Sequence, residues 1–269
     1  MKRTDNNQSG TRAMTTKTAS DTRKMIVACF GASITAAKGS FNWIGELEKR
    51  PQNQRFRFLN FGVGGDLAYS ALQRLGSVVA YHPDLVIIVL GHNDIVTLVF
   101  ENVRRIFGRW KHLPGDPSPA WYRENLQTIV RRLKEETSAR IALASLSQIG
   151  EDPESNNPVQ RELNQRFQQY NEIIKDIARE ENVSYIPFYE RFHEHVVALP
   201  GRAFTAFRFP SFYRDAFRLL VLRRSLDEIA QKNGWRFHTD GLHLNSRGGM
   251  ILADLVQEFL DSELKQGTK

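Results

Sequence analysis

Apolar residues along the chain form short uninterrupted runs, which alternate with longer stretches where apolar and polar positions repeat with helical period. Five runs have the length of buried strands: Met25–Phe30, Phe56–Phe61, Leu85–Leu90, Ile141–Leu146 and Ser184–Phe188. The run at Leu85–Leu90 is apolar at every position, which is typical of a strand that is covered on both faces.

The stretches between and after these runs place their apolar residues on one face of a helix. Two such faces are Tyr122, Leu126, Ile129, Val130, Leu133 and Leu163, Phe167, Tyr170, Ile174, Ile177. A last helix is predicted from Ile251, Leu252, Leu255, Val256, Phe259 and Leu260. The pairs Ser118–Pro119 and Asn157–Pro158 have the pattern of an N-cap followed by proline in the first turn. This alternation predicts an α/β fold, with a parallel sheet between layers of helices.

One segment departs from the alternation. Residues 190–236 follow the fifth predicted strand and mix aromatic residues with arginines, and the part from Phe212 to Ala230 has a helical pattern. We interpret residues 190–236 as a helical insertion close to the functional site.

The composition is that of an ordinary soluble globular protein, with 269 residues of which 41% are hydrophobic and 25% charged. Residues 1–24 have few apolar residues and lack the apolar stretch of a secretory signal, so we predict a disordered basic tail there and one domain over residues 25–269. No run approaches the roughly 18 apolar residues of a transmembrane helix, and a cytoplasmic location is expected.

The net charge of +7 is concentrated in three places. Residues 1–24 carry +4, residues 98–113 carry +3 and residues 200–224 carry +5, which leaves −5 on the rest of the chain. A mildly acidic body with a basic tail and two basic patches differs from a uniformly basic nucleic-acid-binding protein. No specific nucleic-acid partner is therefore predicted.

Cys29 is the only cysteine, which excludes a disulfide within the chain. Its place in the first apolar run predicts a core residue rather than a reactive thiol.

Four short polar segments are candidates for chemistry: Gly31–Thr35, Gly64–Asp66, Gly91–Asp94 and Asp240–His243. The first three follow predicted strands. Because the carboxyl ends of parallel strands meet at the edge of the sheet where ligands bind, we expect Ser33, Gly65 and Asn93 to lie at one edge.

Ser33 is the candidate nucleophile, and a serine hydroxyl needs a base to take its proton. His243 is the candidate base, since imidazole titrates near neutrality. Asp240 lies three residues earlier, from where its carboxylate can fix the tautomer of the ring and stabilise the imidazolium. Acyl transfer also needs hydrogen-bond donors for the developing oxyanion. The backbone N–H groups of Ser33 and Gly65 and the side-chain amide of Asn93 are the candidate donors.

Each segment by itself also has a structural interpretation. Ser33 fits a helix N-cap, Gly64–Gly65 a turn, and Asn93–Asp94 the cap of the next helix. The Asp240–His243 segment fits a surface turn, or part of a metal site with His238.

A metal site has little support beyond that spacing. The remaining clustered histidines, His193 and His195, are expected on an exposed helix or loop. We therefore predict neither a metal nor a cofactor.

The four segments together resemble the sequence blocks of the SGNH hydrolases, the superfamily of the GDSL esterases and lipases. The matching blocks are Phe30–Thr35, Asn60–Asp66, Gly91–Asp94 and Asp240–Asn245. The resemblance runs from about Met25 to about Leu260 and is interrupted by residues 190–236. It implies a flavodoxin-like, three-layer α/β/α sandwich with five parallel strands.

For the site, the resemblance implies a catalytic triad of Ser33, Asp240 and His243. It also implies an oxyanion hole formed by Ser33, Gly65 and Asn93. The implied activity is hydrolysis of a small-molecule carboxylic ester through an acyl-enzyme, without a cofactor.

One position differs from the family pattern, because Ala32 stands where the family usually has aspartate. That aspartate is not the nucleophile, so Ala32 does not exclude the chemistry. Two alternatives remain open: a lipid-directed lysophospholipase or thioesterase, and a catalytically weak binding module on the same fold.

Residues 95–112 and 200–224 combine aromatic and basic residues and follow segments expected at the same sheet edge. One interpretation is a cap that contacts anionic lipid or an acyl chain. The other is a pair of ordinary helices with apolar faces in the core and arginines in water.

Overall fold

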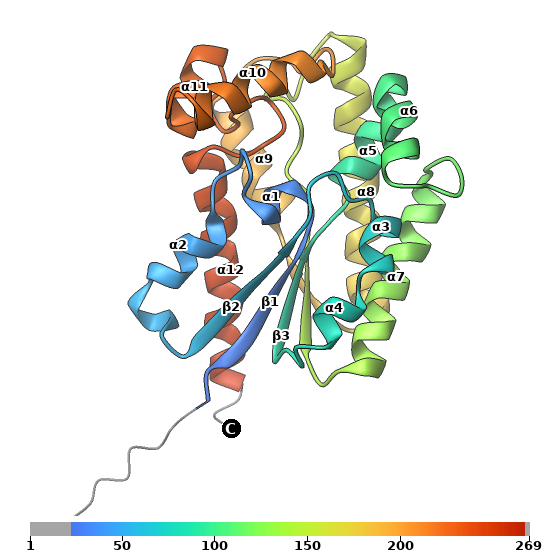
Figure 1. Cartoon of the computed structure of the whole chain (residues 1–269), viewed down its shortest axis with the longest axis vertical. Coiled ribbons are helices and arrows are strands. Elements are labelled where there is room, and N and C mark those ends of the chain that lie inside the picture. Colours follow the sequence, from blue (N-terminus) through green and yellow to red (C-terminus); the bar gives the residue numbers. More distant parts are fainter. Residues whose placement is uncertain (1–22, 267–269) are drawn as a thin grey trace, which may run out of the picture.

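A computed structural model describes residues 23–266. The fold is a five-stranded sheet, and Figure 1 shows helices covering both of its faces. The strands are β1 (Met25–Gly31), β2 (Phe56–Gly62), β3 (Leu85–Val89), β4 (Arg140–Ala144) and β5 (Ser184–Ile186). All neighbouring pairs are parallel and the order is β2-β1-β3-β4-β5. The predicted flavodoxin-like α/β/α sandwich is thereby confirmed.

The helices between β1 and β3 are short. They are α1 (Ser33–Ala36), α2 (Trp43–Lys49), the 3-10 turn η1 (Pro51–Asn53), α3 (Ala68–Gln73) and α4 (Gly76–Val79). Longer helices follow: α5 (His92–Val99), α6 (Glu101–Trp110), α7 (Pro119–Glu136), α8 (Pro158–Glu180), α9 (Phe188–Ala198), α10 (Phe209–Leu220), α11 (Leu226–Asn233) and α12 (Ser246–Gln266).

Alternate side chains of each strand enter two separate cores. On β3, Val86 and Ile88 pack with α7 and α8, whereas Leu85 and Ile87 pack with α2, α9 and α12. Both sets are buried, which explains why β3 is apolar at every position. Cys29 belongs to the second core, and burial raises the pKa of its thiol well above the ordinary value, as expected of an unreactive core residue.

The two predicted N-caps are confirmed. The Ser118 hydroxyl accepts a hydrogen bond from Trp121 N at 3.1 Å and starts α7. The Asn157 side chain accepts from Val159 N at 3.0 Å and starts α8. In both helices proline occupies the first turn. N–H groups in the first turn have no acceptor within the helix, so the missing N–H of proline costs no hydrogen bond.

The fifth strand is shorter than predicted. It ends at Ile186, and Phe188, which we expected in the strand, is the first residue of α9. Pro187 separates the two, because it has no N–H to continue the sheet and is well suited to precede a helix.

The segment at about 190–236 contains the end of α9 and the helices α10 and α11, and the expected helix from Phe212 to Ala230 is divided in two. The break lies between Leu220 and Leu226, where Arg223 has a positive φ of 51°. Ser225 then starts α11 with a capping box completed by Glu228. Figure 1 shows α10 and α11 on the side of the molecule where β1 ends and α1 begins.

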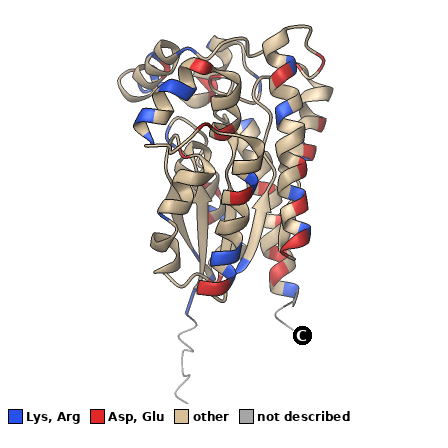
Figure 2. Cartoon of the chain, turned by 90° about the vertical axis from the view of Figure 1, so that its right-hand side faces the viewer, with Lys and Arg blue, Asp and Glu red and all other residues tan. Residues whose placement is uncertain are grey.

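The predicted tail over residues 1–24 lies outside the described residues except for Arg23 and Lys24. Arg23 pairs with Asp84 at 3.2 Å. Across the part of the chain that the structure covers, no helix combines the length and apolarity needed to cross a membrane. Basic and acidic residues are interspersed along the helices seen in Figure 2.

Leu85→Ala tests whether this residue of β3 belongs to the hydrophobic core. Leu85 is fully buried, so we expect the free energy of unfolding in urea to fall by about 2–5 kcal/mol. Leu222→Ala is the matched control, because Leu222 is 54% exposed and its truncation should change stability by less than about 0.5 kcal/mol. Equal effects of the two substitutions would contradict this assignment of the core.

Candidate active site

The strand order brings three of the predicted segments to one edge of the sheet. Gly31 at the end of β1 is paired with Gly62 of β2 on one side and with Val89 of β3 on the other. The chain leaving β2 stays attached, because Val63 N donates to Gly31 O at 3.1 Å. Ser33, Gly65 and Asn93 follow these three strand ends.

The fourth segment contains a well-defined acid–imidazole pair. Asp240 Oδ2 lies 2.7 Å from His243 Nδ1, and Asp240 Oδ1 accepts from the backbone N–H groups of Leu242 and His243 at 3.0 and 2.8 Å. Because an ionised carboxylate can only accept, Nδ1 carries the hydrogen and Nε2 is free to take a proton. The predicted pairing of Asp240 with His243 is therefore present in the structure.

The surroundings shift the pKa values of this pair in opposite directions. Burial disfavours the charged His243 ring, but the nearby Asp240 carboxylate and its hydrogen bond outweigh burial and raise the His243 pKa above 6.5. Burial likewise opposes ionisation of Asp240, and the charge and hydrogen bonds of His243 outweigh it and lower the Asp240 pKa.

Ser33 is the first residue of α1, directly after the end of β1, and its side chain is half-buried. The chain that follows it is tied to the His243 loop. Phe41 N donates to Leu244 O at 2.8 Å, and the Ser40 hydroxyl accepts from Leu244 N at 3.1 Å. These long-range bonds attach the chain at Ser40 and Phe41, shortly after α1, to the loop that carries His243.

One hydrogen bond connects Asn93 to Asp66, the residue after Gly65, and so links the two loops that carry the candidate oxyanion donors outside α1. Asn93, in the first turn of α5, donates from Nδ2 to Asp66 O at 2.8 Å, beside Gly65. The amide nitrogen carries two hydrogens, so this bond leaves one for another acceptor. Gly65 has a φ of 76°, and a Cβ there would overlap the Trp110 ring. The position therefore requires glycine for two reasons.

Asp66 is the centre of an ion cluster that the sequence did not reveal. Its buried carboxylate accepts from Arg74 Nε at 2.6 Å and from Lys111 Nζ at 2.8 Å. Arg74 also donates to Gly31 O, and Lys111 to Gly64 O, both at 2.9 Å. The cluster thus holds the loop around Gly65 against the ends of β1 and α6.

Neither cation had a sequence signal for this role. Arg74 lies near the end of a short helix, and Lys111 belongs to a basic stretch whose charges were expected in water or at a lipid surface. Lys111 is instead 10% exposed, although Arg105 and Arg109 of the same stretch are exposed.

Asp94 supports the same loop from the other side. It is buried and both its oxygens lie 3.2 Å from Ala68 N, so it holds the start of α3. Burial raises the Asp94 pKa to about 8, against which its hydrogen bonds act only partly. Asp94 therefore does not cap α5, which begins after Gly91 without a side-chain cap.

Two further histidines near the site have structural partners. Burial lowers the pKa of His92 to about 3, and its Nε2 lies 3.0 Å from Ser147 O, so this ring stays neutral. His238 is fully buried, with Nδ1 2.9 Å from Glu151 and Nε2 3.0 Å from Gln148 O. Both nitrogens of His238 are occupied, and residues 23–266 contain no cluster of three or more His, Cys, Asp or Glu arranged for a metal ion.

Glu151 also positions the chain that leads to the acid–imidazole pair. Its carboxylate accepts the backbone N–H groups of Arg236, Phe237 and His238 at 2.7–3.0 Å. The carboxylate is fully buried, so these bonds fix three consecutive residues just before Asp240.

Ala32 precedes Ser33 at the site where the family pattern has aspartate. It is buried in the core, and α1 begins there without a side-chain cap. The end of β1 therefore carries no carboxylate at this position, and the Asp240–His243 pair is formed without one.

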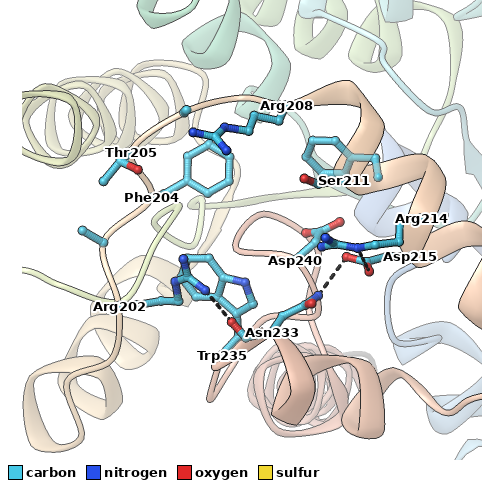
Figure 3. A pocket seen from close by; sticks show the side chains of 13 residues that line it. Arg202, Phe204, Thr205, Arg208, Ser211, Arg214, Asp215, Asn233, Trp235 and Asp240 are labelled. Atoms are coloured by element: carbon cyan, nitrogen blue, oxygen red, sulfur yellow. Dashed lines mark hydrogen bonds and ion pairs between the residues drawn. The ribbon is translucent and has the colours of Figure 1, made fainter.

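Two cavities flank this pair. The apolar cavity has a volume of about 630 Å³, and its lining includes Gly39, Ala216, Leu219, Ile229 and His243. The basic cavity, of about 330 Å³, is shown in Figure 3 with Arg202, Arg208 and Arg214 around it and Asp240 in its wall. The two differ in chemistry, so one side of the site suits hydrocarbon and the other a polar or anionic group.

Phe212 of α10 lines both cavities and lies edge-on to His243, with ring centroids 6.0 Å apart. Phe212, one aromatic residue of the segment from residue 190 to 236, therefore contacts the acid–imidazole pair directly.

Comparisons with known proteins identify a family and a shared fold. The profile of the GDSL-like lipase/acylhydrolase family matches residues 29–249. The acetylxylan esterase Axe2 from Geobacillus stearothermophilus has a similar fold, with a TM-score of 0.59 and 19% identity over 88% of this chain and 94% of that one. A lipolytic G-D-S-L family protein from Veillonella parvula has a TM-score of 0.56 and 16% identity over 87% and 97%. A search of curated proteins found no match.

Asp66→Ala will measure the contribution of the ion cluster. The substitution leaves Arg74 and Lys111 without their shared carboxylate, so we expect the free energy of unfolding to fall by about 3 kcal/mol or more. Asp254→Ala is the control, since Asp254 pairs with Arg50 at the same 2.6 Å but is 58% exposed, and its loss should cost less than about 1 kcal/mol. Similar values from urea unfolding of both variants would contradict a special role for Asp66.

Proposed function

The chain belongs to the GDSL-like lipase/acylhydrolase family, and on this basis we propose that it is a serine hydrolase that cleaves carboxylic esters through an acyl-enzyme. Ser33 is the nucleophile, His243 the general base and acid, and Asp240 the group that orients His243. The observation that carries the proposal is the 2.7 Å contact between Asp240 and His243 Nδ1, in a loop bonded to the chain that follows Ser33.

The first half-reaction transfers the acyl group to the enzyme. The Ser33 oxygen attacks the ester carbonyl while its proton passes to His243 Nε2, and the carbonyl becomes a tetrahedral oxyanion. Collapse of this intermediate breaks the bond to the alcohol, which leaves with the proton from His243. In the second half-reaction, a water molecule gives a proton to His243 and attacks the acyl-enzyme carbonyl. Collapse of this second intermediate breaks the bond to the Ser33 oxygen, which takes the proton back from His243, and the acid is released.

Hydrogen-bond donors stabilise the oxyanion in both half-reactions. The proposal assigns this role to the backbone N–H groups of Ser33 and Gly65 and to the Asn93 amide. The bond from Asn93 to Asp66 O supports the assignment, because it fixes the amide beside Gly65 and leaves one hydrogen available. Removing one donor of this kind typically costs about 10²–10³ in rate.

A second candidate within this chemistry is a lysophospholipase or thioesterase. The apolar cavity beside His243 favours it, because a long acyl chain gains free energy when it leaves water for such a site. A non-enzymatic binding module is the alternative from a different class, and Ala32 is the residue that motivates it. Labelling of the nucleophile separates the enzyme from the module.

Covalent labelling with a fluorophosphonate probe tests the nucleophile. The wild-type protein should label, and Ser33→Ala should abolish the labelling because no other hydroxyl is paired with His243 in this proposal. Ser246→Ala is the control, since Ser246 lies three residues after His243 but bonds Asp227 at 2.8 Å, and it should label normally. A folded wild-type protein that does not label would favour the binding module.

The pH dependence of kcat/KM tests the base. Only neutral His243 can accept a proton, so activity should fall about tenfold per pH unit as the pH drops below the His243 pKa, which lies above 6.5. Asp240→Asn removes the charge that raises this pKa, so the fall should move to lower pH and the maximal rate should decrease by about 10⁴. Asp254→Asn, an exposed carboxylate on α12, should change neither. A profile of the wild type that is flat from about pH 5 to 8 would rule out His243 as the base.

A further inference from the structure

Helix α10 exposes its apolar side to solvent. Tyr213, Phe217 and Leu220 follow one another at helical spacing and are 73%, 53% and 76% exposed. Val221 and Leu222, just after the helix, extend the same exposed apolar surface. We call these five residues the α10 face. They include nearly half of the large hydrophobic residues that are exposed in residues 23–266, which makes the face unlike the rest of the surface.

Helix α10 packs on the core through Phe209 and Phe212 near its start, but beyond them a polar contact attaches it to the rest of the protein. Asp215 is the buried residue of this helix, and it is held by Arg218 Nη1 and Asn233 Nδ2, both at 2.8 Å. The buried residue of α10 is thus a paired carboxylate, whereas Phe217 and Leu220 are exposed to water. This arrangement is typical of a helix that binds a partner on its outer side.

The charge around the α10 face indicates the kind of partner. Residues 208–224 contain five arginines and one aspartate, a net charge of +4. Arg208, Arg214 and Arg223 are exposed at the edges of the face. A second copy of the chain would bring two such basic segments together in a symmetric contact, which is electrostatically unfavourable. An anionic surface complements the same charges.

We propose that the α10 face is a docking surface for anionic phospholipid, with the apolar side chains entering the interfacial region and the arginines contacting the headgroups. Of the two interpretations given for residues 200–224, this proposal adopts the cap that contacts anionic lipid. It does not adopt the ordinary helix with its apolar face in the core.

The α10 face lies next to the proposed active site, so docking would place a membrane beside it. The apolar cavity that contains His243 is lined by Tyr213 and Leu220 of the face and by Leu219 beneath them. An acyl chain can therefore pass from a docked membrane along α10 to the site. This last step rests on the proposed hydrolase function, whereas docking itself does not.

Sedimentation with vesicles tests the docking. Ser33→Ala protein is mixed with vesicles of phosphatidylcholine alone, or of phosphatidylcholine with phosphatidylglycerol, so that binding is measured without hydrolysis. We expect binding to the anionic vesicles that weakens with added salt, and much weaker binding to the neutral ones. Adding Phe217→Asp should reduce binding about tenfold or more, and adding Arg223→Gln about fivefold.

Val197→Asp is the matched control, because Val197 is a 52% exposed residue of α9 that lies outside the face, and it should bind normally. Thermal unfolding of each variant shows that it is folded. The proposal is overturned if anionic vesicles are not bound, or if Phe217→Asp binds as well as its parent. It is also overturned if Phe217→Asp only converts a dimer into a monomer, which would make the face a contact between copies.

Discussion

Close approach of backbones at the carboxyl end of the sheet is the constraint on which the site depends. Gly31 and Gly62 face each other at the ends of β1 and β2. A Cβ at Gly31 would overlap Val89 O, and one at Gly62 would overlap the backbone of Ala36 in α1. Because neither position carries a side chain, α1 lies directly on the strand ends and Ser33 emerges beside the loops that hold Gly65 and Asn93.

Around this edge, buried charges are arranged so that each has a partner. Asp66 is shared by Arg74 and Lys111, Glu151 accepts three backbone N–H groups and His238, and Asp240 is paired with His243. Each carboxylate fixes a loop that would otherwise depend on weak contacts, since an unpaired buried charge is strongly unfavourable. The positions of the proposed catalytic groups therefore rest on electrostatics as much as on the packing of the sheet.

The α10–α11 segment differs from the rest of the molecule in where its apolar side chains lie. The helices α7 and α8 bury their apolar faces against the sheet, whereas α10 turns Phe217 and Leu220 outward and contacts the site through Phe212. The segment supplies walls to two cavities of opposite character, one apolar and one rich in arginine. If the proposals hold, this segment rather than the sheet decides which esters reach Ser33.

Features that depend on neighbours along the chain could be predicted without the structure. Strand and helix order, the caps at Ser118 and Asn157, and the hydrogen-bonded pair Asp240–His243 all follow from residues a few positions apart. The four segments that the family profile spans were also visible as local motifs.

Contacts between groups far apart in the chain could be identified only after folding was known. Lys111 reaches Asp66 across 45 positions and His238 reaches Glu151 across 87, and neither pair leaves a periodic or spacing signal. The same holds for the outward face of α10, because its helical pattern is equally compatible with an apolar side in the core. Helical periodicity predicts that a helix has an apolar face. Whether that face is buried or exposed depends on which other parts of the protein pack against it.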